Sequence, residues 1–132
     1  MKRTLLLTMA CCLLTGLMLG CSSYGTRLEY KGSDLYYTKN VTEAEAKKLG
    51  DYLVKNEFFT DQNKGGTAQL DKSGDTYQFR MVVKEGVAID DKLVALFGSI
   101  ARQISKDVFN GAKVEVHLCD NNLKTLKVVP MA

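Results

Sequence analysis

Glu115, His117 and Cys119 have side chains that could bind a metal ion or support nucleophilic chemistry. Their spacing of two places them on one face of a β-strand, because successive strand side chains point to opposite faces. Zinc and copper accept such a mixture of donors. A closed zinc site needs about four ligands, however, and the chain has one histidine. A Cys–His nucleophile would also need an oxyanion donor and a residue that orients the base, and neither is evident. We therefore predict no catalytic residue, no metal, no cofactor and no enzyme activity.

The same strand carries polar side chains that could bind a ligand without catalysing a reaction. A second strand, expected over residues 76–83, alternates between apolar and polar side chains. If the two strands are neighbours, their polar sides form one open sheet face. We predict that any ligand, whether glycan, peptide or metal, binds on the face formed by Gln78, Arg80, Glu115 and His117.

The elements that would position this face can be read along the chain. Strands are expected at 35–37, 68–71, 76–83, 113–119 and 123–129. Thr42 and Glu45 form a capping box that begins a first helix, which ends near Asn56. A second helix, capped by Asp90 or Asp91, carries an apolar stripe of Leu93, Leu96, Phe97, Ile100, Ile104 and Val108 and stops at Asn110-Gly111.

This order of elements, β-α-β-β-α-β-β, predicts an α+β fold. The economical arrangement is a two-layer sandwich, with a mostly antiparallel sheet and both helices on its apolar face. With 132 residues, 45% of them hydrophobic and 25% charged, the chain has the composition of one folded domain. We assign that domain to residues 34–132.

The first twenty residues form a secretory signal rather than part of the domain. Lys2 and Arg3 precede an apolar run over residues 5–19, which is shorter than the ~20 residues that span a bilayer. Gly20 and Cys21 then form a cleavage step, followed by small polar residues. We predict removal of residues 1–20 and a flexible tether over residues 21–33. Alternatives are an uncleaved membrane anchor and an ordinary soluble secreted protein.

Removal of the signal changes the charge and the cysteine inventory. The whole chain has 18 basic and 15 acidic residues. Loss of Lys2 and Arg3 therefore leaves a net charge of +1, and no basic patch indicates binding to nucleic acid. Of the four cysteines, Cys11 and Cys12 leave with the signal, which leaves Cys21 and Cys119, and if the Cys21 thiol is modified only Cys119 stays a free thiol. No disulfide is expected.

Several segments carry resemblances to known families. Met18-Leu19-Gly20-Cys21 resembles the lipobox of bacterial lipoproteins at its small residue and its cysteine, which implies a lipid on Cys21. Ser22 follows the cysteine, where an aspartate would resemble the inner-membrane retention signal, so the resemblance favours the periplasmic side of the outer membrane in a cell with two membranes. Residues 41–50, 76–80 and 107–119 look like parts of a bacterial domain of unassigned function.

A looser resemblance concerns the order of elements alone. β-α-β-β-α-β is similar to the SPOR peptidoglycan-binding domain, although no glycan-binding motif matches, so the analogy speaks only of fold. We expect a lipid-anchored module of the bacterial cell envelope, whose partner is an envelope protein or peptidoglycan. The alternative expectation is an envelope lipoprotein that binds a glycan, a peptide or a metal on the open polar face.

Overall fold

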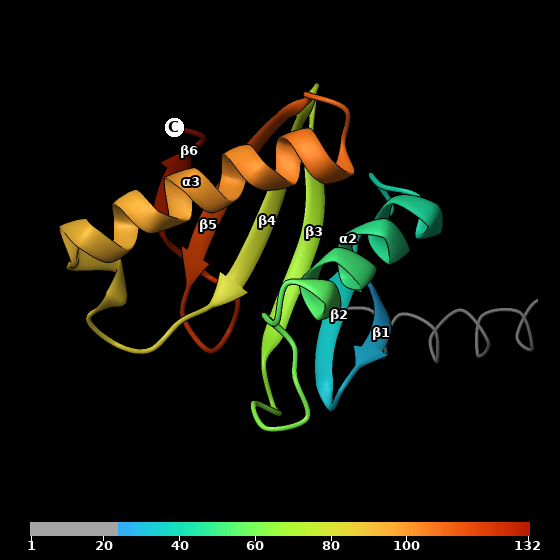
Figure 1. Ribbon diagram of the computed structural model, residues 1–132, viewed down its shortest axis with the longest axis horizontal. Helices are drawn as coiled ribbons and strands as arrows, with labels where there is room; N and C mark the ends of the chain where they lie inside the picture. The colour runs from blue at the N-terminus through green and yellow to red at the C-terminus, as the bar shows by residue number, and fades with distance from the viewer. Residues whose placement is uncertain (1–23) are drawn as a thin grey trace, which may run out of the picture.

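The computed structural model describes residues 24–132 (Figure 1). The predicted signal segment and Cys21 lie outside these residues. The strands are β1 (Thr26–Tyr30), β2 (Ser33–Tyr37), β3 (Thr67–Ser73), β4 (Thr76–Val82), β5 (Lys113–Cys119) and β6 (Thr125–Pro130). The helices are α2 (Glu43–Lys55), the short 3-10 helix η1 (Val87–Ile89) and α3 (Asp91–Val108).

The strands form one six-stranded sheet in the order of the chain, β1-β2-β3-β4-β5-β6. Each consecutive pair that is joined by a turn is antiparallel: β1 with β2, β3 with β4, and β5 with β6. The two joins that contain a helix, from β2 to β3 and from β4 to β5, are parallel, because the helix returns the chain to the same end of the sheet. The α+β class is confirmed, and the sheet is mixed, with antiparallel neighbours in the majority.

The tether predicted over residues 21–33 is wrong where the structure describes it. Residues 26–30 form β1, which pairs with β2 from Thr26 opposite Tyr37 to Tyr30 opposite Ser33. Lys31 and Gly32 both have positive φ, 55° and 80°, and make the two-residue turn typical of a hairpin. The folded unit therefore begins about eight residues earlier than the predicted boundary at 34.

Both helices begin where their capping residues predict. The Thr42 hydroxyl accepts a hydrogen bond from the Glu45 amide at 3.1 Å, and the Glu45 carboxylate accepts one from the Thr42 amide at 2.8 Å. Asp90 accepts hydrogen bonds from the Lys92 and Leu93 amides at the start of α3. These side chains satisfy amides that have no partner within the helix.

The core lies between the sheet and the two helices, which Figure 1 shows on the same side of the sheet. Apolar strand residues from neighbouring strands share that side; Leu70 pairs with Phe79, and Phe79 pairs with Val116. Ala46, Leu49 and Leu53 of α2 and Ala101, Ile104 and Val108 of α3 belong to the same buried cluster.

The predicted stripe on α3 is only partly correct. Ile104 and Val108 are buried, whereas Leu96 is 53% exposed. Gly98 and Ala101 are buried instead, and a Cβ on Gly98 would be in ordinary van der Waals contact with the Pro130 carbonyl oxygen, at 3.4 Å. The helix therefore approaches β6 through a small residue, which a pattern of large apolar residues does not reveal.

Candidate functional site

The four side chains of the predicted ligand-binding face lie on adjacent strands of the sheet. The register of β4 and β5 places Gln78 beside Glu115 and Arg80 beside His117. On the other side of β4, Arg80 faces Gln69 of β3. This face is opposite to the one that carries Phe79 and Val116, because side chains alternate along each strand.

Arg80 organises this face through hydrogen bonds within the protein. Its Nη2 donates to the Leu123 carbonyl oxygen at 2.6 Å, and its Nη1 lies 3.0 Å from both the Thr125 hydroxyl and Nδ1 of His117. Leu123 and Thr125 belong to the segment that leads from β5 into β6. The guanidinium therefore fastens that turn to the middle of the sheet.

The bond to Arg80 also fixes the tautomer of His117. A guanidinium has donors and no acceptor, so Nδ1 of His117 must accept. Nε2 then donates to Glu115 Oε1, 3.1 Å away. His117 is only 7% exposed, so both of its ring nitrogens are engaged in the network.

Cys119 is fully buried rather than available on the polar face. Its thiol donates to the His117 carbonyl oxygen at 3.5 Å. Burial raises the pKa of the Cys119 thiol, although the Arg80 charge acts in the opposite direction. A reactive cysteine has the contrary properties, exposure and a lowered pKa. Among residues 24–132, no group of three or more histidine, cysteine or acidic side chains is close enough to hold a metal ion.

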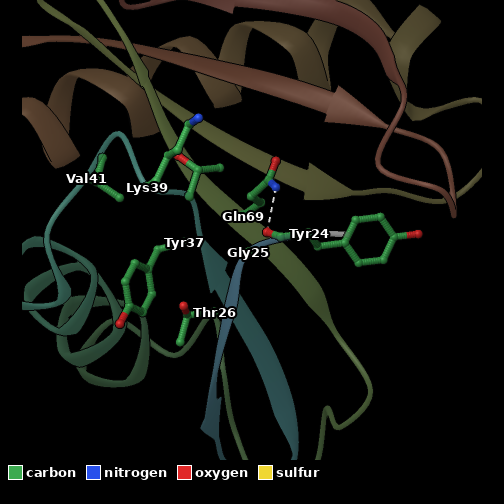
Figure 2. Close-up of a pocket in the computed structure, with 8 residues that line it drawn as sticks. Tyr24, Gly25, Thr26, Tyr37, Lys39, Val41 and Gln69 are labelled. Carbon is green, nitrogen blue, oxygen red and sulfur yellow. Dashed lines mark hydrogen bonds between the residues drawn. The ribbon is translucent and has the colours of Figure 1, made fainter. Parts of the chain in front are cut away.

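A pocket of about 380 Å³ lies where the chain enters the sheet (Figure 2). Its lining includes Tyr24, Gly25, Tyr37, Lys39 and Gln69. Figure 2 shows the Gln69 side chain reaching the Tyr24 carbonyl oxygen, with a hydrogen bond of 2.8 Å. The Tyr24 ring also packs edge-on against Tyr36, with ring centroids 5.4 Å apart. The entry of the chain is thus held against the polar side of the sheet.

Gly25 is required for this entry. Its φ is +101°, and a Cβ there would lie 2.1 Å from the Tyr37 carbonyl oxygen. Only glycine combines this conformation with such close backbone contact. The pocket therefore depends on the backbone conformation of Gly25 at the start of β1.

The sheet formed by the described residues ends in β1 on one side and β6 on the other. At the β1 edge, Arg27 forms ion pairs with Asp34 at 2.7 Å and with Glu29 at 3.4 Å. At the β6 edge, Leu126 is 54% exposed and Val128 is 44% exposed. Met131 follows, 37% exposed. We call Leu126, Val128 and Met131 the β6 apolar edge.

These observations define a small α+β domain with a six-stranded mixed sheet, a polar face with an internal network and one apolar edge. The chain matches the AF_1994_N family, described as a family N-terminal domain, over residues 27–130. The chain therefore belongs to this family. No curated protein and no solved structure matches it. Within residues 24–132, no helix is both long and apolar enough to cross a membrane.

Sequence reasoning brought together the four polar side chains correctly but missed the features at both edges. β1 could have been recognised from Leu28 and Tyr30 before the Lys31-Gly32 turn. The exposure of Val128 had no local signal, because it depends on the register of β6 with β5, which places Val128 beside His117 on the face without helices and Val129 beside Val116 on the core face.

Proposed function

We propose that this protein is a lipid-anchored, non-enzymatic module of the bacterial cell envelope, and that it binds a partner protein through the β6 apolar edge. The observation that supports the binding most is the exposure of Leu126 and Val128 on a strand with no second neighbour among the described strands. Exposed strand edges pair readily with an added strand, and apolar side chains supply specificity.

The start of the domain supports a close attachment to the membrane. Tyr24 is held by Gln69 and Tyr36, and Cys21, the expected lipidation site, is three residues earlier in the sequence. Three peptide steps of 3.8 Å reach about 11 Å at most. A lipid on Cys21 would therefore keep the β1 side of the domain at the membrane surface. We propose the periplasmic side of the outer membrane, since Ser22 and not an aspartate follows the cysteine.

The β6 edge is well placed for a partner in this arrangement. Five strand spacings separate it from β1, a distance of about 24 Å at ~4.8 Å per spacing. A partner strand would pair along residues 125–129, because Pro130 has no amide hydrogen to donate. With the β1 edge near the membrane, the β6 edge would point away from the membrane and remain accessible to a partner.

The open polar face supports the alternative, ligand binding, less well. We take the fold as a two-layer sandwich, with helices on one face of the sheet and the polar residues on the other. Arg80 already donates to Leu123, Thr125 and His117, and His117 Nε2 donates to Glu115. A glycan or peptide there would have to compete with these internal bonds. Gln78 is the member of the set that the network leaves out.

The anchor and the edge can be tested separately in cells. Cys21→Ser should abolish acyl labelling and leave unprocessed precursor. Unchanged labelling and gel mobility would refute the lipid anchor. If the protein fractionated with inner-membrane markers, the outer-membrane assignment would be wrong.

For the edge, a photo-crosslinking amino acid at Val128 should capture a partner protein. The matched control is the same amino acid at Arg27 on the β1 edge, which should capture none. Equal capture at the two positions, or capture at Arg27 alone, would contradict the proposal.

A further inference from the structure

A second cavity, of about 280 Å³, lies at the end of the sheet opposite to the chain entry. Its accessible apolar surface comes from the half-buried Phe58 and Met81, with the core residues Leu53, Phe59 and Phe79, which are at most 7% exposed, behind them. These residues belong to the end of α2, the segment after it and β4. Ligand pockets are typically ~300–1,000 Å³ and mostly apolar. The volume of this cavity lies just below that range, so it could hold a small ligand.

The loop that closes one side of the cavity is held in place by Ser33. The Ser33 side chain is fully buried, accepts a hydrogen bond from the Gly66 amide at 3.1 Å and donates one to the Asn63 carbonyl oxygen at 3.4 Å. The Gly65 amide donates to the Gly32 carbonyl oxygen at 3.0 Å. The wall is therefore formed before any ligand binds, which reduces the ordering cost of binding.

The charged side chains that line the cavity are two lysines, Lys64 and Lys84. Both are exposed, and within residues 24–132 neither forms an ion pair. Glu85 follows Lys84 in the chain but does not line the cavity. A lining with apolar side chains, two cations and no anion is complementary to an apolar chain that ends in a negative charge.

We propose that this cavity binds an anionic amphiphile of short chain length. The apolar chain lies against Phe58 and Met81, and the carboxylate or phosphate head lies between Lys64 and Lys84. The cavity volume restricts the chain length, and the paired lysines select the charged head. This site is separate from the β6 apolar edge and does not depend on a lipid at Cys21.

The methionines provide a direct test. Met81 lines the cavity and Met131 lies beside β6, and these are the two methionines of the described residues. The full chain, labelled with ¹³C at the methionine methyl groups and held in lipid nanodiscs without free detergent, is titrated with octanoate and separately with octyl phosphate. We expect a saturable shift of the Met81 signal, identified by its loss in Met81→Leu, with Met131 unchanged.

The two titrations distinguish the source of the anionic head. Tighter binding of octanoate indicates a free fatty acid, and tighter binding of octyl phosphate indicates a phospholipid-type head. Octanol, which has the chain without the charge, should bind clearly more weakly. Equal binding of octanol, no shift at Met81, or equal shifts at Met81 and Met131 would each overturn the proposal.

The role of the two lysines is tested by a double substitution that removes both of their charges. Lys64→Gln with Lys84→Gln should weaken octanoate binding by about two- to thirtyfold, as expected for two solvent-exposed ion pairs. The matched control, Lys113→Gln with Lys124→Gln, removes two exposed lysines that do not line the cavity and should leave binding unchanged. Equal weakening in the two double variants would refute a specific role for Lys64 and Lys84. A measurement of the melting temperature of each variant serves as the folding control, and we expect the value of the parent protein.

Discussion

The two edges of the sheet, β1 and β6, differ in how they are attached and in what they present to solvent. β1 is short and carries Arg27 and Glu29 in ion pairs, whereas β6 presents the apolar side chains of Leu126 and Val128. Charged side chains on an edge strand discourage pairing with other chains, and an apolar edge permits it. β6 also carries the exposed Lys127 and ends at Pro130, so the two edges differ in the apolar surface beside the strand and not in the presence of charge.

The attachments differ as well. β1 is held by backbone conformation and close packing, through Gly25 against Tyr37 and through the Tyr30 ring against Gly50 of α2. β6 is held by polar bonds, from Arg80 to the preceding turn and from the Ala132 amide to the Gly98 carbonyl oxygen at 3.1 Å. Substitutions at matched positions should therefore affect the two edges in different ways.

Gly25→Ala should produce the largest effect. Alanine at this position would have to keep the positive φ of Gly25, and its Cβ would collide with the Tyr37 carbonyl oxygen. We therefore expect the free energy of unfolding to fall by roughly 2–5 kcal/mol because of strain and overpacking. Hydrogen exchange should show faster exchange in β1 than in β6. A variant with unchanged stability and exchange would mean that β1 is not held at Gly25.

Arg80→Ala should destabilise the β6 side by about 1.5–3 kcal/mol, the usual value of hydrogen bonds to a charged group. The Leu123 carbonyl oxygen would lose its partner, and exchange should accelerate in β6. The control is Arg27→Ala, which removes surface ion pairs and should cost about 0–1 kcal/mol. Equal losses from both arginines in urea unfolding would contradict the asymmetry.

Two helical glycines should respond to alanine in opposite directions. In Gly50→Ala the new Cβ lies 2.2 Å from the Tyr30 ring, so the ring must move and we expect a loss of about 1–3 kcal/mol. In Gly98→Ala the nearest contact is 3.4 Å, and better helix propensity should add up to ~1 kcal/mol. Thermal unfolding measures both; changes of the same sign would show that α2 and α3 pack equally closely on the sheet.

Acid should weaken the hydrogen bonds that Asp71 of β3 accepts from Thr38 and Asn40 and the one that Glu45 of α2 accepts from Tyr77 of β4. Burial alone would raise the pKa of Asp71, but hydrogen bonds from Thr38, Asn40 and the Lys72 amide outweigh it and lower this pKa below 3.8. In the same way, hydrogen bonds donated to the Glu45 carboxylate by the Tyr77 hydroxyl and by the Thr42 amide and hydroxyl outweigh burial and lower the pKa of Glu45 below 4.5.

A lowered folded-state pKa stabilises the protein above the ordinary value, and this contribution is lost as the pH falls through the folded-state value. The free energy of unfolding should therefore fall as the pH drops below about 4.5. Asp71→Asn with Glu45→Gln should make this decline shallower. An identical pH dependence in the double variant, measured by urea unfolding, would contradict the assignment.

Sequence alone determined the features that depend on neighbouring residues. The capping box of Thr42 and Glu45 and the left-handed stop at Asn110-Gly111 were predicted, and the cap of α3 was narrowed to Asp90 or Asp91, because these features involve bonds or conformations a few residues apart. The alternation around Phe79 correctly separated the apolar face of the sheet from its polar face. Alternation also placed Gln78 with Arg80, and Glu115 with His117, on one side of each strand, and the pairing of β4 with β5 then brought the four together.

Only the tertiary structure decided which strands became edges and what the polar atoms bind. Val128 and Val129 are both valines of the last strand, but Val128 pairs with His117 on the face that the helices leave open and is 44% exposed, whereas Val129 pairs with Val116 on the core face and is 4% exposed. Arg80 could have met a ligand, but the Leu123 carbonyl, 43 residues away, accepts its hydrogen bond. Such contacts join residues far apart in the chain, and local patterns carry no information about them.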